Sequence, residues 1–157
     1  MSRSESSGYG DERNTVRRTI QRIAVEAAWA PLSILIAHTV AGAIFGHEPV
    51  VDPIMHFLGG AAACYFFRRA AELASSVLGT MKPLALDLFS FGLACTMAVF
   101  WEIGEFTGDR LFRGHAQRGL SNTMRDLILG LAGAIVCLLC LRAVGFFRAA
   151  ELGREEG

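Results

Sequence analysis

The sequence predicts an all-α integral membrane protein, built as an antiparallel bundle of four transmembrane helices. The chain of 157 residues is 52% hydrophobic and has a mean hydropathy of +0.39. Its apolar residues gather in long blocks separated by short polar connections, which is typical of membrane spans. The block AAWAPLSILIAHTVAGAIFG, residues 27–46, has about the 20 residues that a helix needs to cross a bilayer core.

The predicted elements follow in order along the chain. Residues 1–15 are polar, rich in glycine and serine and without periodicity, so a disordered tail is predicted there. The domain of residues 16–149 holds four spans, over residues 27–46, 52–78, 83–106 and 123–147. Residues 150–157 form a charged C-terminal tail. Small residues favour close helix contacts in lipid, and they stand at Gly59, Gly60, Gly104, Gly108, Gly130 and Ala134.

Basic residues beside the spans predict an orientation in the inner (plasma) membrane. Basic groups in both termini and around Arg68 and Lys82 indicate that these segments are cytoplasmic, with the first and third connections outside. The third connection departs from this rule because it carries Arg110, Arg113, Arg118 and Arg125. Either this topology is wrong or something specific holds these arginines.

Two features of the composition indicate no chemistry. Fifteen basic and fifteen acidic residues give zero net charge, so nothing points to nucleic acid as a partner. All four cysteines lie within apolar blocks, including the Cys137 and Cys140 of a CxxC pattern. Cysteine in such surroundings usually packs as a small apolar residue, so we assign these four no redox or metal role.

Six ionisable side chains lie at helix ends that an up-and-down bundle brings to one face of the membrane. The second span begins with Asp52 and His56, and the fourth begins with Asp126. The third span ends with Glu102, Glu105 and Asp109. We therefore predict a polar cluster at this face.

Helix capping is an alternative explanation for two of these residues. Asp52 precedes Pro53, a common helix start, and Asp126 stands three residues after Thr123, as in a capping box. His56 follows Asp52 by four residues and therefore shares its helix face. A histidine within a span and beside an acid favours a functional role over packing.

The three acids of the third span have no such explanation. Glu102, Glu105 and Asp109 fall at offsets of 0, 3 and 7, within roughly 60° around the helix. The helix dipole disfavours each anion at this end by about 0.3–1 kcal/mol. An ionised acid in the apolar layer costs roughly 2.5–3.5 kcal/mol at the bilayer centre. We therefore expect these three acids either to bind a cation or to be protonated.

Two sources of that cation are open. The arginines of the third connection could pair with the acids as a structural network. Alternatively, a divalent metal could bind here, since mixed histidine and carboxylate ligands suit Zn, Mn or Fe, and carboxylates with water suit Mg. The two are compatible, because arginines beside a metal suit a phosphate-bearing substrate.

Three motifs resemble the YjdF-like family of small bacterial integral membrane proteins: DPIMHFLGG (52–60), WEIGEFTGD (101–109) and NTMRDLILGLAGA (122–134). The likeness covers roughly residues 30–145, and the D-x-x-x-H-F element alone is also similar to the VanZ-like family. The resemblance implies a multi-helix membrane fold and no particular activity. It also implies a shared polar signature of Asp52, His56, Glu102, Glu105, Asp109, Thr123 and Asp126. Asn122 departs from the family pattern, which has an acid before the threonine.

These residues favour a metal-dependent membrane hydrolase or transferase acting on a lipid or lipid-linked anionic head group. The expected metal ligands are His56, Glu102, Glu105 and Asp126. The expected catalytic groups are Asp52 and Asp109. The residues expected to hold the head group are Arg113, Arg118 and Arg125. Two alternatives stay open, a cation or proton carrier and a structural subunit with neutralised acids. The expected partners are the bilayer, the lipid head group and a second copy of the chain.

Overall fold

The computed structural model describes residues 3–45, 51–113 and 116–155, and within these ranges it contains helices and no strands. The helices are α1 (Arg3–Glu26), α2 (Trp29–Phe45), α3 (Val51–Leu73), α4 (Ser75–Leu78), α5 (Pro83–Phe112) and α6 (Leu120–Glu155). The predicted all-α class is confirmed.

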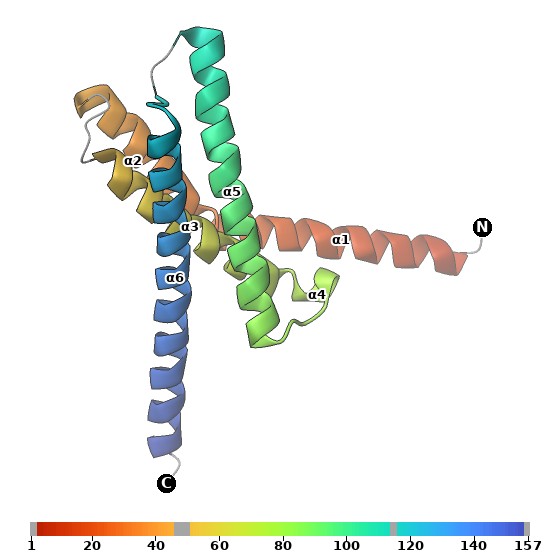
Figure 1. The fold of residues 1–157 in the computed structure, drawn as a ribbon. Helices are drawn as coiled ribbons and strands as arrows, with labels where there is room; N and C mark the ends of the chain where they lie inside the picture. Colours follow the sequence, from red (N-terminus) through yellow and green to blue (C-terminus); the bar gives the residue numbers. More distant parts are fainter. Residues whose placement is uncertain (1–2, 46–50, 114–115, 156–157) are drawn as a thin grey trace.

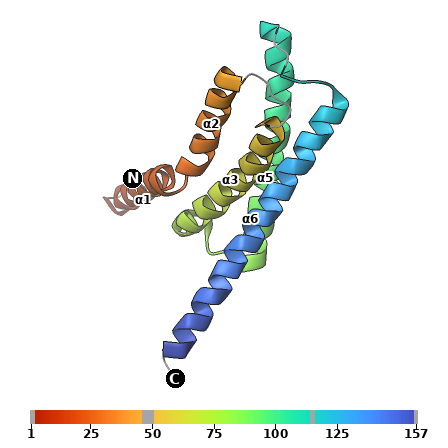
Figure 2. The same ribbon diagram turned by 90° about the vertical axis from the view of Figure 1, so that its left-hand side faces the viewer.

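The long helices alternate in direction, as short connections require. α2 and α5 run toward one end of the molecule, and α3 and α6 begin at that end and run back (Figure 1). α3 lies in the middle and packs against α2, α5 and α6 (Figure 2). The start of α3, the end of α5 and the start of α6 therefore lie at the same end of the bundle.

Glycines set the close approach of α3 to α6. A Cβ built on Gly60 would lie 1.9 Å from the carbonyl oxygen of Gly130, and one on Gly133 would lie 1.9 Å from that of Phe57. Close contact is thus confirmed for Gly60 and Gly130, and Ala134 is also buried in the core. At Gly59, Gly104 and Gly108 an added Cβ would meet nothing within 4 Å among the described residues, so for these three close contact stays a prediction.

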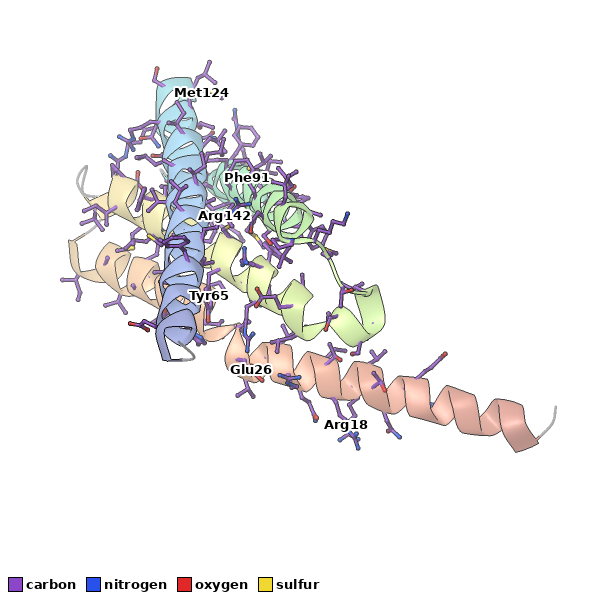
Figure 3. The ribbon with its side chains drawn as sticks, turned by 90° about the horizontal axis from the view of Figure 1, so that it is seen from below. Arg18, Glu26, Tyr65, Phe91, Met124 and Arg142 are labelled. Atoms are coloured by element: carbon purple, nitrogen blue, oxygen red, sulfur yellow. The ribbon has the colours of Figure 1, made fainter. Side chains whose placement is uncertain are left out.

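α1 leaves the bundle sideways instead of continuing it (Figure 1). Seen from below, Glu26 lies where α1 joins the bundle and Arg18 lies farther out (Figure 3). The Glu26 carboxylate accepts a hydrogen bond from Arg69 of α3 at 2.7 Å, which ties this junction to the bundle.

Helix extends into both of the predicted tails. The backbone is helical from Arg3, although the sequence predicts a disordered tail over residues 1–15; residues 1–2 lie outside the described ranges. α6 likewise continues to Glu155, within the predicted C-terminal tail of residues 150–157. The physical reason is shared, because adding a residue to an existing helix costs far less than starting one. No proline interrupts either stretch.

Two described helices are long and apolar enough to cross a membrane, namely α5 and the part of α6 over Leu120–Phe146. A third span results if Glu12–Glu26 and Trp29–Ile44, which meet at a 45° bend, act as one. α3 is not among them, because charged residues such as Asp52 and Arg68 dilute its apolar content. The bundle of four transmembrane helices therefore stays a prediction.

One buried acid, Asp87, joins three helices at the far end of the bundle. Asp87 of α5 is 5% exposed and accepts hydrogen bonds from Arg68 of α3 and from Arg142 of α6, the latter at 2.5 Å. This pairing compensates a carboxylate that would otherwise be costly to bury. Asp87 thus works as a buried ionic link between helices.

Candidate functional site

The imidazole of His56 lies at the centre of the acids that the topology predicts to converge. Its Nε2 lies 3.5 Å from Asp52 Oδ1 and 3.8 Å from Asp126 Oδ2. Its Nδ1 lies 3.6 Å from Glu102 Oε1. The side chains of His56, Glu102 and Asp126 are at most 8% exposed. Helices α3, α5 and α6 therefore meet at one buried histidine.

Two sets of ligand atoms share this histidine. One set contains Asp52, His56 and Asp126, and the other contains His56, Glu102 and Glu105. Within each set the ligand atoms lie within 4.8 Å of one another. The structure therefore brings all four predicted metal ligands around one ring, together with Asp52.

Arg125 neutralises the Nε2 side of the histidine. Its Nη2 donates to Asp52 Oδ2 at 3.2 Å and to Asp126 Oδ1 at 2.9 Å. Asn122 also donates a hydrogen bond to Asp126, which is 1% exposed. One arginine of the third connection is thus held by acids of the cluster, as one of the two sequence interpretations requires.

The Nδ1 side has no arginine of this kind in the described part of the chain, although the Thr123 side chain hydrogen-bonds to Glu102. Among the described residues, no lysine or arginine lies within 4.0 Å of the Glu102 or Glu105 carboxylate. Glu105 Oε1 accepts a hydrogen bond from Trp101 Nε1 at 2.8 Å. Glu102 is 5% exposed, and its Oε2 has no hydrogen-bond partner in the described part of the chain. A buried oxygen without a partner costs about 1–3 kcal/mol, and more when it is charged.

The distances from His56 are longer than direct hydrogen bonds, and those to Asp52 and Glu102 fall in the range expected between two ligand atoms of one metal. Distances of 3.5–3.8 Å exceed the usual 2.7–3.2 Å of a hydrogen bond to nitrogen. Ligand atoms that lie about 2.0–2.2 Å from one tetrahedral metal are separated by roughly 3.3–3.6 Å. Neutral imidazole nitrogen and carboxylate oxygen are also the donors that Zn, Mn and Fe accept.

Three predicted site residues, Asp109, Arg113 and Arg118, belong to neither ligand set. Asp109 accepts hydrogen bonds from the backbone N–H groups of Ala116 and Gln117, at 2.9 and 2.8 Å, and so shapes the α5–α6 connection. Arg113 ends α5 in the left-handed conformation, and both Arg113 and Arg118 are exposed at this connection.

Trp101 is a site residue that sequence reasoning missed. Besides its bond to Glu105, its ring meets the ring of His38 edge-on, with centroids 5.3 Å apart. This contact joins α2 to α5 beside the cluster. The signal was its spacing of four residues before Glu105, which places the two side chains on one helix face.

A family model described as "Predicted membrane protein (DUF2238)" matches residues 16–145. This chain belongs to the DUF2238 family. Its membership makes the protein a predicted membrane protein in contact with the lipid bilayer. The likeness to the YjdF-like family stays a prediction.

This DUF2238 chain is similar to an uncharacterized protein of Thermotoga maritima. The two are 33% identical over 105 residues, which cover 64% of this chain and 54% of the relative. The chain therefore spans about half the length of the curated relative it matches. No solved structure matches the chain.

Proposed function

We propose that this DUF2238 protein is a membrane-embedded, metal-dependent hydrolase or transferase whose metal is held by His56 Nδ1, Glu102 and Glu105. The observation that carries the proposal is the buried Oε2 of Glu102, which has no hydrogen-bond partner among the described residues and belongs to a carboxylate grouped with His56 and Glu105. A bound cation removes the cost of burying this carboxylate.

Charge balance favours the Nδ1 side over the Nε2 side. Arg125 already compensates Asp52 and Asp126, whereas Glu102 and Glu105 have no arginine or lysine partner among the described residues. One divalent ion neutralises that pair. Asp52 and Asp126 then face the other ring nitrogen at 3.5 and 3.8 Å, on the side where acids commonly orient a metal-bound imidazole.

Three protein ligands favour an enzyme over a purely structural metal site. Structural zinc sites use four protein ligands, whereas catalytic sites keep a position for water or substrate. At that position a metal polarises a phosphoryl or ester oxygen or activates water. The exposed Arg113 and Arg118 lie on the connection next to this end of the bundle and suit an anionic lipid head group. We place this end outside the inner membrane, with both termini cytoplasmic.

The test is the metal content of the protein purified in mild detergent without chelators. We expect about one divalent ion per chain, and its loss in the Glu102→Gln, Glu105→Gln double variant. Glu72→Gln is the matched control, because Glu72 is an exposed acid that pairs with Arg68 and Arg69 at the far end of α3. Full retention of metal in the double variant would refute the assignment.

Arg125 gives specific support to a second candidate, a structural subunit in which acids and arginine neutralise each other. It predicts no stoichiometric metal in any variant. It also predicts that the sign exchange Asp52→Arg, Arg125→Asp keeps the melting temperature. The metal enzyme predicts the opposite for this exchange, since an arginine at residue 52 places positive charge beside His56 and expels the ion.

A further inference from the structure

A cavity of about 280 Å³ runs from the acid cluster into the apolar part of the bundle. Its walls come mainly from α2, α3 and α5. The polar side chains on its surface are His38, His56, Glu102 and Asp126, and the remaining lining is apolar or glycine. Along α3 the lining extends from Met55 to Phe67, and the part from His56 to Phe67 is about 16 Å long at 1.5 Å per helical residue.

The cavity is partly open to the surroundings of the bundle. The lining residues Leu35 of α2 and Met97 of α5 are 46% and 48% exposed, so the opening lies between these two helices. α2 packs against α3, and its backbone stays apart from that of α5 (Figure 2). In a bilayer this side faces lipid, which gives a hydrocarbon chain a lateral route to the site.

The dimensions suit one chain. A volume of 280 Å³ along about 16 Å gives room inside the cavity, or slot, for one extended hydrocarbon chain. A length of about 16 Å also reaches roughly from the interface to the middle of a bilayer core that is ~30 Å thick. The polar end of the slot is the His56 cluster.

We propose that the cavity binds a single-chain amphiphile with a phosphate head, the chain lying between α2 and α5 and the head at the His56–Glu102 end. The head assignment rests on the proposed metal, because the acids there would repel an anion without it. Leaving the lipid gives a chain no hydrophobic gain. The head therefore supplies the affinity, and the slot supplies the selection for one chain.

Trp101 makes this testable, because it lines the cavity, whereas Trp29, the second tryptophan of the chain, does not. In a Trp29→Phe background, bromine atoms on a bound chain quench Trp101 fluorescence. The probes are brominated lysophosphatidate and brominated phosphatidate, which share a phosphate head and differ in having one chain or two. We expect saturable quenching by the single-chain probe at a concentration at least tenfold below that of the two-chain probe.

Gly59→Leu fills the slot without a backbone clash, since Gly59 lines the cavity and its Cβ would meet nothing within 4 Å. Gly92→Leu is the matched control, because Gly92 has the same open space and lies outside the cavity. We expect Gly59→Leu to abolish the saturable quenching and Gly92→Leu to leave it unchanged. Equal quenching by both probes, or equal behaviour of both variants, would overturn the proposal.

Metal content, measured on the same samples, separates this proposal from the proposed enzyme. Bound metal with no chain selectivity overturns the slot and leaves the metal site standing. If no metal is bound, a brominated long-chain alcohol, whose head is neutral, replaces the phosphate probes. Saturable quenching that Gly59→Leu removes would then support the chain slot alone, and its absence would overturn it.

Discussion

At the scale of residues, two buried carboxylates in this chain have different surroundings. Asp87 has two arginine partners, Arg68 and Arg142. Glu102 has His56 at 3.6 Å and one carboxylate oxygen without a hydrogen-bond partner among the described residues. A paired buried acid is a structural link, whereas an acid with an unsatisfied oxygen in a cavity indicates a binding site. The two acids therefore predict different effects of neutralisation.

Metal should stabilise the protein only when His56 is present. A ligand at 100 times its Kd stabilises the folded state by about 2.7 kcal/mol. We expect Zn²⁺ or Mn²⁺ to raise the melting temperature of the wild-type protein in detergent and to leave that of His56→Asn unchanged. An equal rise in both proteins would mean that the ion binds elsewhere.

Neutralising Asp87 should destabilise the protein without affecting metal binding. Removing one partner of a buried ion pair costs about 3–5 kcal/mol, and the exposure of Arg142 places Asp87→Asn at the lower end. We expect a melting temperature lower by roughly 5–10 °C. Glu72→Gln, an exposed partner of Arg68, should change it by little, since surface pairs contribute about 0–1 kcal/mol. Equal stability of Asp87→Asn and wild type would contradict this role.

At the scale of elements, the contact between α3 and α6 positions the cluster. The absence of side chains at Gly60 and Gly133 lets the two backbones approach closely. The same approach brings Asp126 of α6 to His56 of α3, because Gly130 lies one turn after Asp126 and Gly60 one turn after His56. Packing of these helices and assembly of the site are therefore coupled.

Gly60→Ala should separate α3 from α6. Its Cβ would lie 1.9 Å from a backbone oxygen, which cannot move as a side chain can. Overpacking costs about 1–3 kcal/mol, and the shift should also weaken metal binding. Gly104→Ala is the control, because its Cβ meets open space and alanine favours a helix by up to about 1 kcal/mol. Thermal unfolding of both variants measures the difference, and a Gly60→Ala protein as stable as Gly104→Ala would disprove the tight contact.

At the scale of the whole molecule, the two charge networks lie at opposite ends of the bundle. Asp52, Arg125 and Asp126 lie at the end where α3 and α6 begin, and Arg68 and Asp87 lie at the other. Asp52 and Asp126 neutralise Arg125, so Arg125 favours a cytoplasmic position less than an unpaired arginine would. This reduces the conflict between the positive-inside rule and a third connection outside the membrane.

Single cysteines at the two ends should report opposite sides of the membrane. In a background without the four native cysteines, Ser121→Cys should react with an impermeant maleimide in intact cells. Thr80→Cys should react only after permeabilisation. Both residues are exposed in the structure. Labelling of Thr80→Cys alone in intact cells would reverse the orientation, and labelling of both would contradict the spans between them.

The sequence by itself determined the helical class and the face of the cluster. Long apolar blocks with short connections leave an up-and-down arrangement, and this places Asp52, His56, Glu102 and Asp126 at one end regardless of detail. It also allowed an arginine partner for the acids, and Arg125 is that partner.

Only the tertiary structure decided how these side chains pair. Sequence spacing fixes which residues share a helix face, but not the rotation of each helix about its axis. That rotation depends on close contacts such as Gly60 against Gly130, which look the same in sequence as Gly59 or Gly104. It places Asp126 at His56, leaves Asp109 to bind the backbone of the α5–α6 connection, and opens the cavity between α2 and α5. Local spacing thus predicted the candidates, and packing between distant segments selected among them.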